Sequence, residues 1–145
     1  IKRVMETSSI KVIENELQRT EDPESESVYE KVNKKVQIYE IDGPFFFGIA
    51  NKFDELAAET TTRKPQVRIV RMRKVPFIDS TGLKNLRSLC DKSRKEKIQI
   101  ILSGVTDEVY QVLDRSGFAD ELGKEFIFDH ISKALDKANE LTANK

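Results

Sequence analysis

Short apolar runs alternate with longer amphipathic stretches from about residue 36 to the end of the chain. Val36–Ile41 and Val67–Met72 are rich in β-branched residues, a composition that favours β-strands. Ile98–Leu102 is short, apolar and followed by Ser103-Gly104, a pattern typical of a buried strand. Phe126–Phe128 predicts a last, short strand. Together these runs predict the strands of a sheet.

Between the predicted strands, apolar residues recur at the spacing of one helix face. This spacing predicts a first helix over residues 49–60, a second that begins near Thr81 or Gly82, a third capped by Thr106 and a last one capped by Asp129. Strands that alternate with helices of about 10–15 residues indicate right-handed βαβ crossovers and a mainly parallel sheet. The fold class that the pattern predicts is therefore α/β.

A run of phenylalanines follows the first predicted strand. Gly43-Pro44 breaks or kinks that strand, and Phe45, Phe46 and Phe47 come directly after it. Because successive residues of a strand point to opposite faces, at least one of these rings is expected in the core. The alternative is that the rings line a groove for a partner or an acyl chain.

Residues 1–30 differ in composition from the rest of the chain. Acidic residues cluster around Pro23 with serines between them, at Glu14, Glu16, Glu21, Asp22, Glu24, Glu26 and Glu30. We interpret residues 1–30 as an acidic linker and residues 31–145 as a domain that folds without it. The apolar residues between Ile10 and Leu17 leave open a short strand or helix that packs against a neighbour.

The composition bounds what the chain can do. Its 145 residues, of which 38% are hydrophobic, are enough for one domain with a single core. Lys+Arg and Asp+Glu both number 25, so no net charge favours binding to nucleic acid or to an anionic membrane. No stretch approaches the roughly 20 apolar residues of a membrane-spanning helix.

Cys90 is the only cysteine and His130 the only histidine. These counts exclude a disulfide framework and a Cys-rich zinc site, and we expect no metal and no bound cofactor. They also leave no credible pair of nucleophile and base, so we assign no catalytic residue and predict that the chain is not an enzyme. We interpret Cys90 as a small core residue and His130 as an exposed helical residue.

Basic residues without an intervening acid surround the second predicted strand. They are Arg63, Lys64, Arg68, Arg71, Arg73 and Lys74. We interpret them as the solvated side of an edge strand, where charge opposes aggregation. The alternative is a patch that attracts anions or faces lipid. Because Phe and Tyr are not interleaved with this run, nucleic acid is not expected as a partner.

The second predicted strand leads into a helix through the polar turn Asp79, Ser80, Thr81 and Gly82. In one interpretation the short side chains cap the helix, and Gly82 permits a tight turn. In the other, the free N–H groups and the positive end of the helix dipole bind an anion, such as the phosphate of a weakly bound nucleotide. A phosphate attached to Thr81 or Ser80 would add roughly −1.5 to −2 charges beside Asp79 and make the turn a switch.

The order of the predicted elements around this turn resembles the STAS domain, which anti-sigma-factor antagonists and SulP anion permeases share. The resemblance covers about residues 30–142 and implies a mainly parallel sheet of four to five strands with about four helices. In the antagonists a partner kinase phosphorylates a serine just before the glycine, and here Thr81 holds that position. Ser80 matches the neighbouring hydroxyl and Asp79 the acid that begins the motif.

Two further segments resemble the permease branch of this family. Ile1–Met5 is similar to the basic exit from the last transmembrane helix of a SulP protein, and the acidic stretch after it to the variable linker. Val36–Gly43, followed by Pro44 and the phenylalanines, resembles a permease pattern in which a strand ends in Asp-Gly-Pro. The resemblance implies a regulatory or interaction domain of a SulP-type secondary anion transporter, on the cytoplasmic face of the membrane.

The implied partners are the transmembrane domain of the same permease, a cytoplasmic regulatory protein or kinase, and other copies of the parent transporter. Two other functions stay open. One is a free-standing anti-sigma-factor antagonist controlled by phosphorylation, and the other is a nucleotide-binding module that uses the Asp79 turn and nearby basic residues. A run of apolar helical segments encoded upstream of Ile1 would distinguish the permease from the antagonist.

Overall fold

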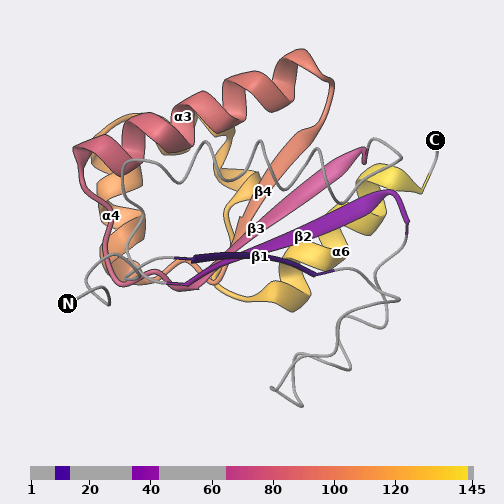
Figure 1. The fold of residues 1–145 in the computed structure, drawn as a ribbon, viewed down its shortest axis with the longest axis horizontal. Coiled ribbons are helices and arrows are strands. Elements are labelled where there is room, and N and C mark those ends of the chain that lie inside the picture. The colour runs from indigo at the N-terminus through magenta and orange to yellow at the C-terminus, as the bar shows by residue number, and fades with distance from the viewer. Residues whose placement is uncertain (1–8, 14–33, 43–64, 144–145) are drawn as a thin grey trace.

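A four-stranded sheet with helices on both faces forms the core of the computed structural model (Figure 1). The structure describes residues 9–13, 34–42 and 65–143. The strands are β1 (Ser9–Ile13), β2 (Val36–Asp42), β3 (Val67–Lys74) and β4 (Gln99–Ser103). They lie in the order β1-β2-β3-β4, in which β2, β3 and β4 are parallel and β1 is antiparallel to β2.

Helices follow the parallel strands along the chain. They are α3 (Ser80–Lys95), α4 (Asp107–Arg115), α5 (Phe118–Leu122), the short 3₁₀ helix η2 (Lys124–Phe126) and α6 (Ile131–Thr142). Helix α3 covers one face of the sheet, and α6 lies against the opposite face (Figure 1). The parallel strands are therefore covered by helices on both faces of the sheet.

Alternate residues of the strands build two separate cores. Tyr39 and Val70 belong to the core shared with α3, α4 and α5, whereas their neighbours Ile38 and Ile69 pack against α6. This division follows from the two-residue period of a strand, which sends successive side chains to opposite faces. Each face of the sheet thus depends on its own set of helices.

Most of the predicted elements are present in the structure. Strands at 36–41, 67–72 and 98–102 are confirmed, as is a helix after the Asp79 turn. Thr106 caps α4 as predicted, because its Oγ1 accepts a hydrogen bond from the Val109 N–H at 3.3 Å. The predicted helix over 49–60, the Gly43-Pro44 break and the phenylalanine run lie outside the described residues.

Two predictions near the C-terminus were wrong. Phe126–Phe128 is not a strand, because Phe126 ends η2 and Ile127 makes a single parallel bridge with Leu102. The last helix is capped by His130 and not by Asp129: the His130 Nδ1 accepts a hydrogen bond from the Ser132 N–H at 3.1 Å. His130 is exposed, as predicted, but it precedes the helix. Asp129 pairs instead with Lys133, one turn later.

Strand β1 lies in the segment that the sequence predicts as a linker. Ser9–Ile13 adds an antiparallel edge strand to the sheet, with Ile10 opposite Ile41 and Ile13 opposite Ile38. Residues 9–13 are therefore not a spacer. The apolar residues near Ile10 are consistent with this strand, which the sequence pattern allows as one alternative. That residues 31–145 fold without residues 1–30 stays a prediction.

The interpretation of the basic run as a solvated edge was also wrong for its residues on β3, whereas Arg63 and Lys64 lie outside the described residues. Strand β3 is an interior strand between β2 and β4, and Arg68 and Arg71 are both buried. Arg73 Nε donates to Glu40 Oε2 on β2 at 2.7 Å, so this charge is paired within the sheet. Buried side chains cannot present an exposed basic patch, and the alternative interpretation fails for Arg68 and Arg71 as well.

Candidate functional site

The polar turn lies where the chain passes from β3 into α3, at the edge of the sheet where the parallel strands end. After Lys74 the chain continues through a short irregular segment in which Val75 and Ile78 are buried. These two anchors hold the segment against the core, so the turn that follows has a defined position. Open α/β sheets commonly expose their binding surface at this edge.

Asp79 is the N-cap of α3. Its backbone is extended, with φ −95° and ψ −178°, and its Oδ1 accepts a hydrogen bond from the Gly82 N–H at 2.7 Å. Its carbonyl oxygen accepts from the Leu83 N–H at 2.8 Å, which closes the first helical turn. The capping interpretation of Asp79 is therefore confirmed, and the carboxylate satisfies one of the free donors at the helix start.

The structure keeps the four predicted site residues together but gives them different surroundings. Asp79, Ser80 and Thr81 are exposed, whereas Gly82 is buried. Gly82 therefore serves the close packing of the first turn, and the two hydroxyls face solvent. The first turn of α3 contains no acidic residue, so the positive end of the helix dipole is offset by Asp79 at the cap.

Removal of the cap is expected to destabilise the protein modestly. Asp79→Ala should lower the free energy of unfolding by about 0.5–2 kcal/mol, because the Gly82 N–H loses its acceptor. Asp79→Asn keeps an acceptor oxygen and should stay within a few tenths of a kcal/mol of wild type. Urea unfolding measures both variants, and an equal loss for Asn and Ala would contradict the capping role.

Phe77 completes the exposed surface beside the turn. Among the described residues it is the large hydrophobic side chain that stays exposed, at 49%. It lies two residues before Asp79, so an aromatic ring, a carboxylate and two hydroxyls share one stretch of surface. Sequence reasoning missed Phe77. Strand alternation gave no signal for it, because Phe77 lies two residues after buried Val75 and directly before buried Ile78.

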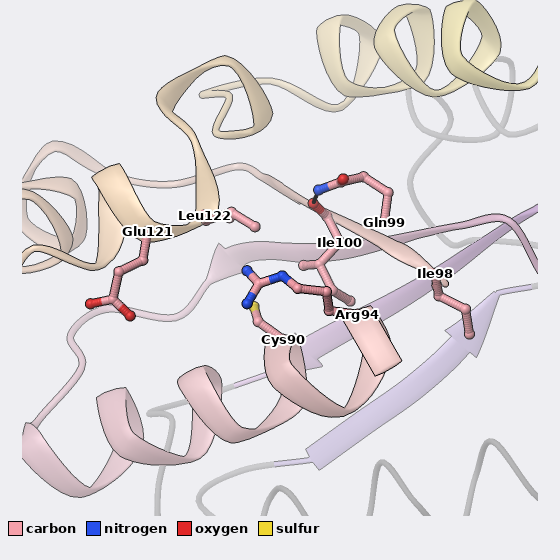
Figure 2. Close-up of a pocket in the computed structure, with 7 residues that line it drawn as sticks. All are labelled: Cys90, Arg94, Ile98, Gln99, Ile100, Glu121 and Leu122. Carbon is pink, nitrogen blue, oxygen red and sulfur yellow. Dashed lines mark hydrogen bonds between the residues drawn. The ribbon is translucent and has the colours of Figure 1, made fainter. Parts of the chain in front are cut away.

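A hollow of about 420 Å³ opens beside β4 between α3 and α5 (Figure 2). Its lining residues are Cys90, Arg94, Ile98, Gln99, Ile100, Glu121 and Leu122. Burial raises the pKa of the Cys90 thiol to about 12, so the sulfur stays protonated at physiological pH. Arg94 pairs with Asp91 at 3.3 Å, and Glu121 pairs with Arg87 at 3.0 Å. This hollow therefore presents no activated nucleophile.

The Cys90 thiol is expected to resist alkylation in the folded protein. At pH 8 the thiolate is the reactive form, and a thiol with a pKa of about 12 is almost entirely protonated. Iodoacetamide should therefore modify Cys90 rapidly in guanidinium chloride and slowly in native buffer. Mass spectrometry over time measures both rates, and equal rates would show that the thiol is not protected.

The described residues contain no group of three or more His, Cys, Asp or Glu side chains that could hold a metal ion. None of the helices in this part of the chain is long and apolar enough to cross a membrane. The exposed groups at the turn are two hydroxyls, a carboxylate and an aromatic ring, which are suited to binding a partner or to covalent modification.

The sheet order, the helices on both faces and the capped turn define an α/β domain of the anti-sigma-factor-antagonist type. The STAS domain profile matches residues 27–138, and the chain belongs to the STAS domain family. The resemblance seen in the sequence is thereby confirmed. Among solved structures, a sulfate transporter family protein from Wolinella succinogenes is 42% identical, with a TM-score of 0.76 over 86% of this chain and 100% of that one.

Two other solved structures share the fold. The STAS domain of a SulP transporter from Vibrio cholerae is 29% identical, with a TM-score of 0.70 over 79% of this chain and 89% of that chain. A putative anti-sigma factor antagonist from Thermotoga maritima, at 18% identity and a TM-score of 0.62, covers 75% of this chain and 92% of its own and shares the fold.

The curated relatives are sulfate transporters of much greater length. The putative sulfate transporter YvdB of Bacillus subtilis is 26% identical over 95 residues, which cover 66% of this chain and 18% of the relative. Sulfate transporter 1.3 of Arabidopsis thaliana is 31% identical over 88 residues, which cover 59% of this chain and 13% of the relative. This chain therefore spans less than a fifth of either transporter.

Proposed function

We propose that this chain is the cytoplasmic regulatory or interaction domain of a SulP-type secondary anion transporter. The observation that carries the proposal is the 42% identity to the solved chain of a sulfate transporter family protein, which the match covers entirely, together with a match to under a fifth of longer sulfate transporters. The domain acts on the cytoplasmic face of the membrane and contacts the transmembrane domain of its own permease. Copies of the domain meet through the parent transporter.

The proposed working surface is the Asp79–Thr81 turn with the neighbouring Phe77. Three features support it: the hydroxyls are exposed, the cap fixes their position, and the adjacent ring offers apolar contact area to a partner. A kinase would modify Thr81 in preference to Ser80, and a nucleotide would place its phosphate against the same helix start. In either case the surface potential of the turn changes while the cap remains.

The domain acts by binding and carries out no reaction of its own in this proposal. Its one cysteine is buried and protonated, and its one histidine caps α6 through Nδ1. Neither group is available as a base or nucleophile at the turn. A free-standing antagonist shares the fold, but the identity to the Thermotoga antagonist is 18% against 42% for the transporter family chain.

A charge at Thr81 is expected to change binding and transport more than stability. Thr81→Glu adds a carboxylate next to Asp79, and the helix dipole offsets part of the repulsion, so unfolding free energy should change by less than about 1 kcal/mol. Transport by the full-length permease, or affinity for its cytoplasmic partner, should change severalfold. Thr81→Ala should leave both close to wild type in the absence of the kinase.

Ser88→Glu is the matched control, because Ser88 is exposed on the same helix and away from its start. It adds the same charge without touching the turn and should leave transport unchanged. Wild-type transport in Thr81→Glu, or unfolding of Thr81→Ala, would reduce the turn to a structural cap.

A further inference from the structure

Arg68 is a buried cation near the start of the interior strand β3. On β3 it lies in register with Gln37 of β2 and Ile100 of β4, and its side chain reaches towards α3. The residue is 7% exposed. A guanidinium at this depth has lost nearly all contact with water, so its charge must be balanced by groups around it.

The residues that the structure describes supply few groups that could balance this charge. Arg68 Nη1 donates to Ser93 Oγ at 3.4 Å, which is a long hydrogen bond, and Cζ lies 5.1 Å from the centre of the Tyr39 ring. The Nε–H is buried and has no hydrogen-bond partner. Within the described part of the chain no carboxylate pairs with this guanidinium. Among the described residues, the positive charge is therefore left without a counter-ion.

Arg73 shows the usual arrangement on the same strand. Its Nε donates to Glu40 Oε2 at 2.7 Å, so cation and anion are joined across β2 and β3. By contrast, Arg68 has an unsatisfied hydrogen-bond donor, and it lies at a buried position where an unpaired charge lowers the stability of the fold. A small anion would satisfy both the charge and the free Nε–H.

We infer that Arg68 binds a small monovalent anion with coplanar oxygens, of the carboxylate or nitrate class, beneath the C-terminal half of α3. A guanidinium presents a planar fork of donors that matches two coplanar oxygens. One cation balances one negative charge, so a divalent phosphate would bring an uncompensated charge into a buried site. The Ser93 hydroxyl supplies a further donor. The site lies far along α3 from the Asp79 turn and does not depend on the proposed function.

The first test follows the Arg68 Nε–H directly by NMR of the whole chain while formate is added. The buried Nε–H exchanges slowly with water and should give a resolved signal. We expect that signal to shift saturably with formate while the Thr81 amide stays in place. An Arg68 signal that does not move, or that shows contact with a carboxylate of the chain before formate is added, would overturn the inference.

The second test measures melting temperature against formate concentration for wild type, Arg68→Met and Arg115→Met. At ten times its Kd the anion should raise the folding constant of wild type about 11-fold. Arg115 is exposed, so its variant should keep this rise and controls for general salt effects. Arg68→Met should lose the rise and melt at or above wild type without formate, because an apolar side chain replaces an unpaired buried charge.

Two results of the melting experiment would overturn the inference. A formate response that Arg68→Met retains would place the anion elsewhere. A fall of ten degrees or more in the melting temperature of Arg68→Met without formate would mean that the guanidinium already has an internal counter-charge, and the proposed site would not exist.

Discussion

Gly104→Ala is expected to destabilise the domain by roughly 2–6 kcal/mol. Gly104 has a φ of +67°, a left-handed conformation that costs a residue with a Cβ about 1–3 kcal/mol. A Cβ here would also lie 2.7 Å from Arg73 N and 2.9 Å from Arg73 Cα. Because these are backbone atoms of the neighbouring strand, relief requires β3 and the chain after β4 to separate, at an overpacking cost of about 1–3 kcal/mol.

Guanidinium chloride unfolding measures this loss, and Gly117→Ala is its matched control. Gly117 also has a positive φ, at +86°, but a Cβ there would meet nothing closer than Glu121 Oε2 at 3.9 Å. The control should therefore lose only the conformational term, about 1–3 kcal/mol. Equal losses in the two variants would mean that the contact with Arg73 relaxes without cost.

Phe118→Ala is expected to cost about 3–5 kcal/mol, a range typical of a large aromatic side chain removed from a core. Phe118 is 1% exposed and begins α5, and its ring joins the core formed by the sheet with α3 and α4. Without the ring, a helix of five residues has little left to hold it against that core. Chemical unfolding should show a lower midpoint, and the α5 amides should exchange faster with solvent.

Phe77→Ala is the control for the same chemical change at the surface. Phe77 is 49% exposed, so its removal should alter the unfolding free energy by about 0.5 kcal/mol or less. The variant should bind the cytoplasmic partner more weakly if the turn surface is the binding surface. A loss in Phe77→Ala as large as that in Phe118→Ala would contradict the assigned burial of the two rings.

The local sequence pattern was sufficient to predict the elements that depend on residues close together in the chain. Runs rich in β-branched and apolar residues predict the strands at 36–41, 67–72 and 98–102. The caps at Asp79 and Thr106 depend on a hydrogen bond to an N–H three residues later, which a sequence motif can specify. The same short range explains why the turn could be selected as the candidate site.

The elements that sequence reasoning missed are decided by contacts with distant residues. Helix α5 is too short to show a helical period, and it is held by the burial of Phe118. Ile127 bridges Leu102 without a full strand, because η2 occupies the residues before it. His130 caps α6 because its Nδ1 reaches the Ser132 N–H, a use of histidine that cap preferences do not favour.

The sequence by itself determined the fold class and the capped polar turn, because both follow from periodicity and from residues adjacent in the chain. The family was recognised in the sequence by its resemblance to the STAS domain, which the family profile confirms. Only the tertiary structure decided the strand order, and with it the environment of the basic residues on β3. An alternating strand has the same pattern at an edge as in the interior, and the difference lies in which strands pair with it. The pairing of β3 with β2 and β4 buries Arg68 and leaves Gly104 against Arg73, and the antiparallel pairing of β1 with β2 brings Ser9–Ile13 into the sheet.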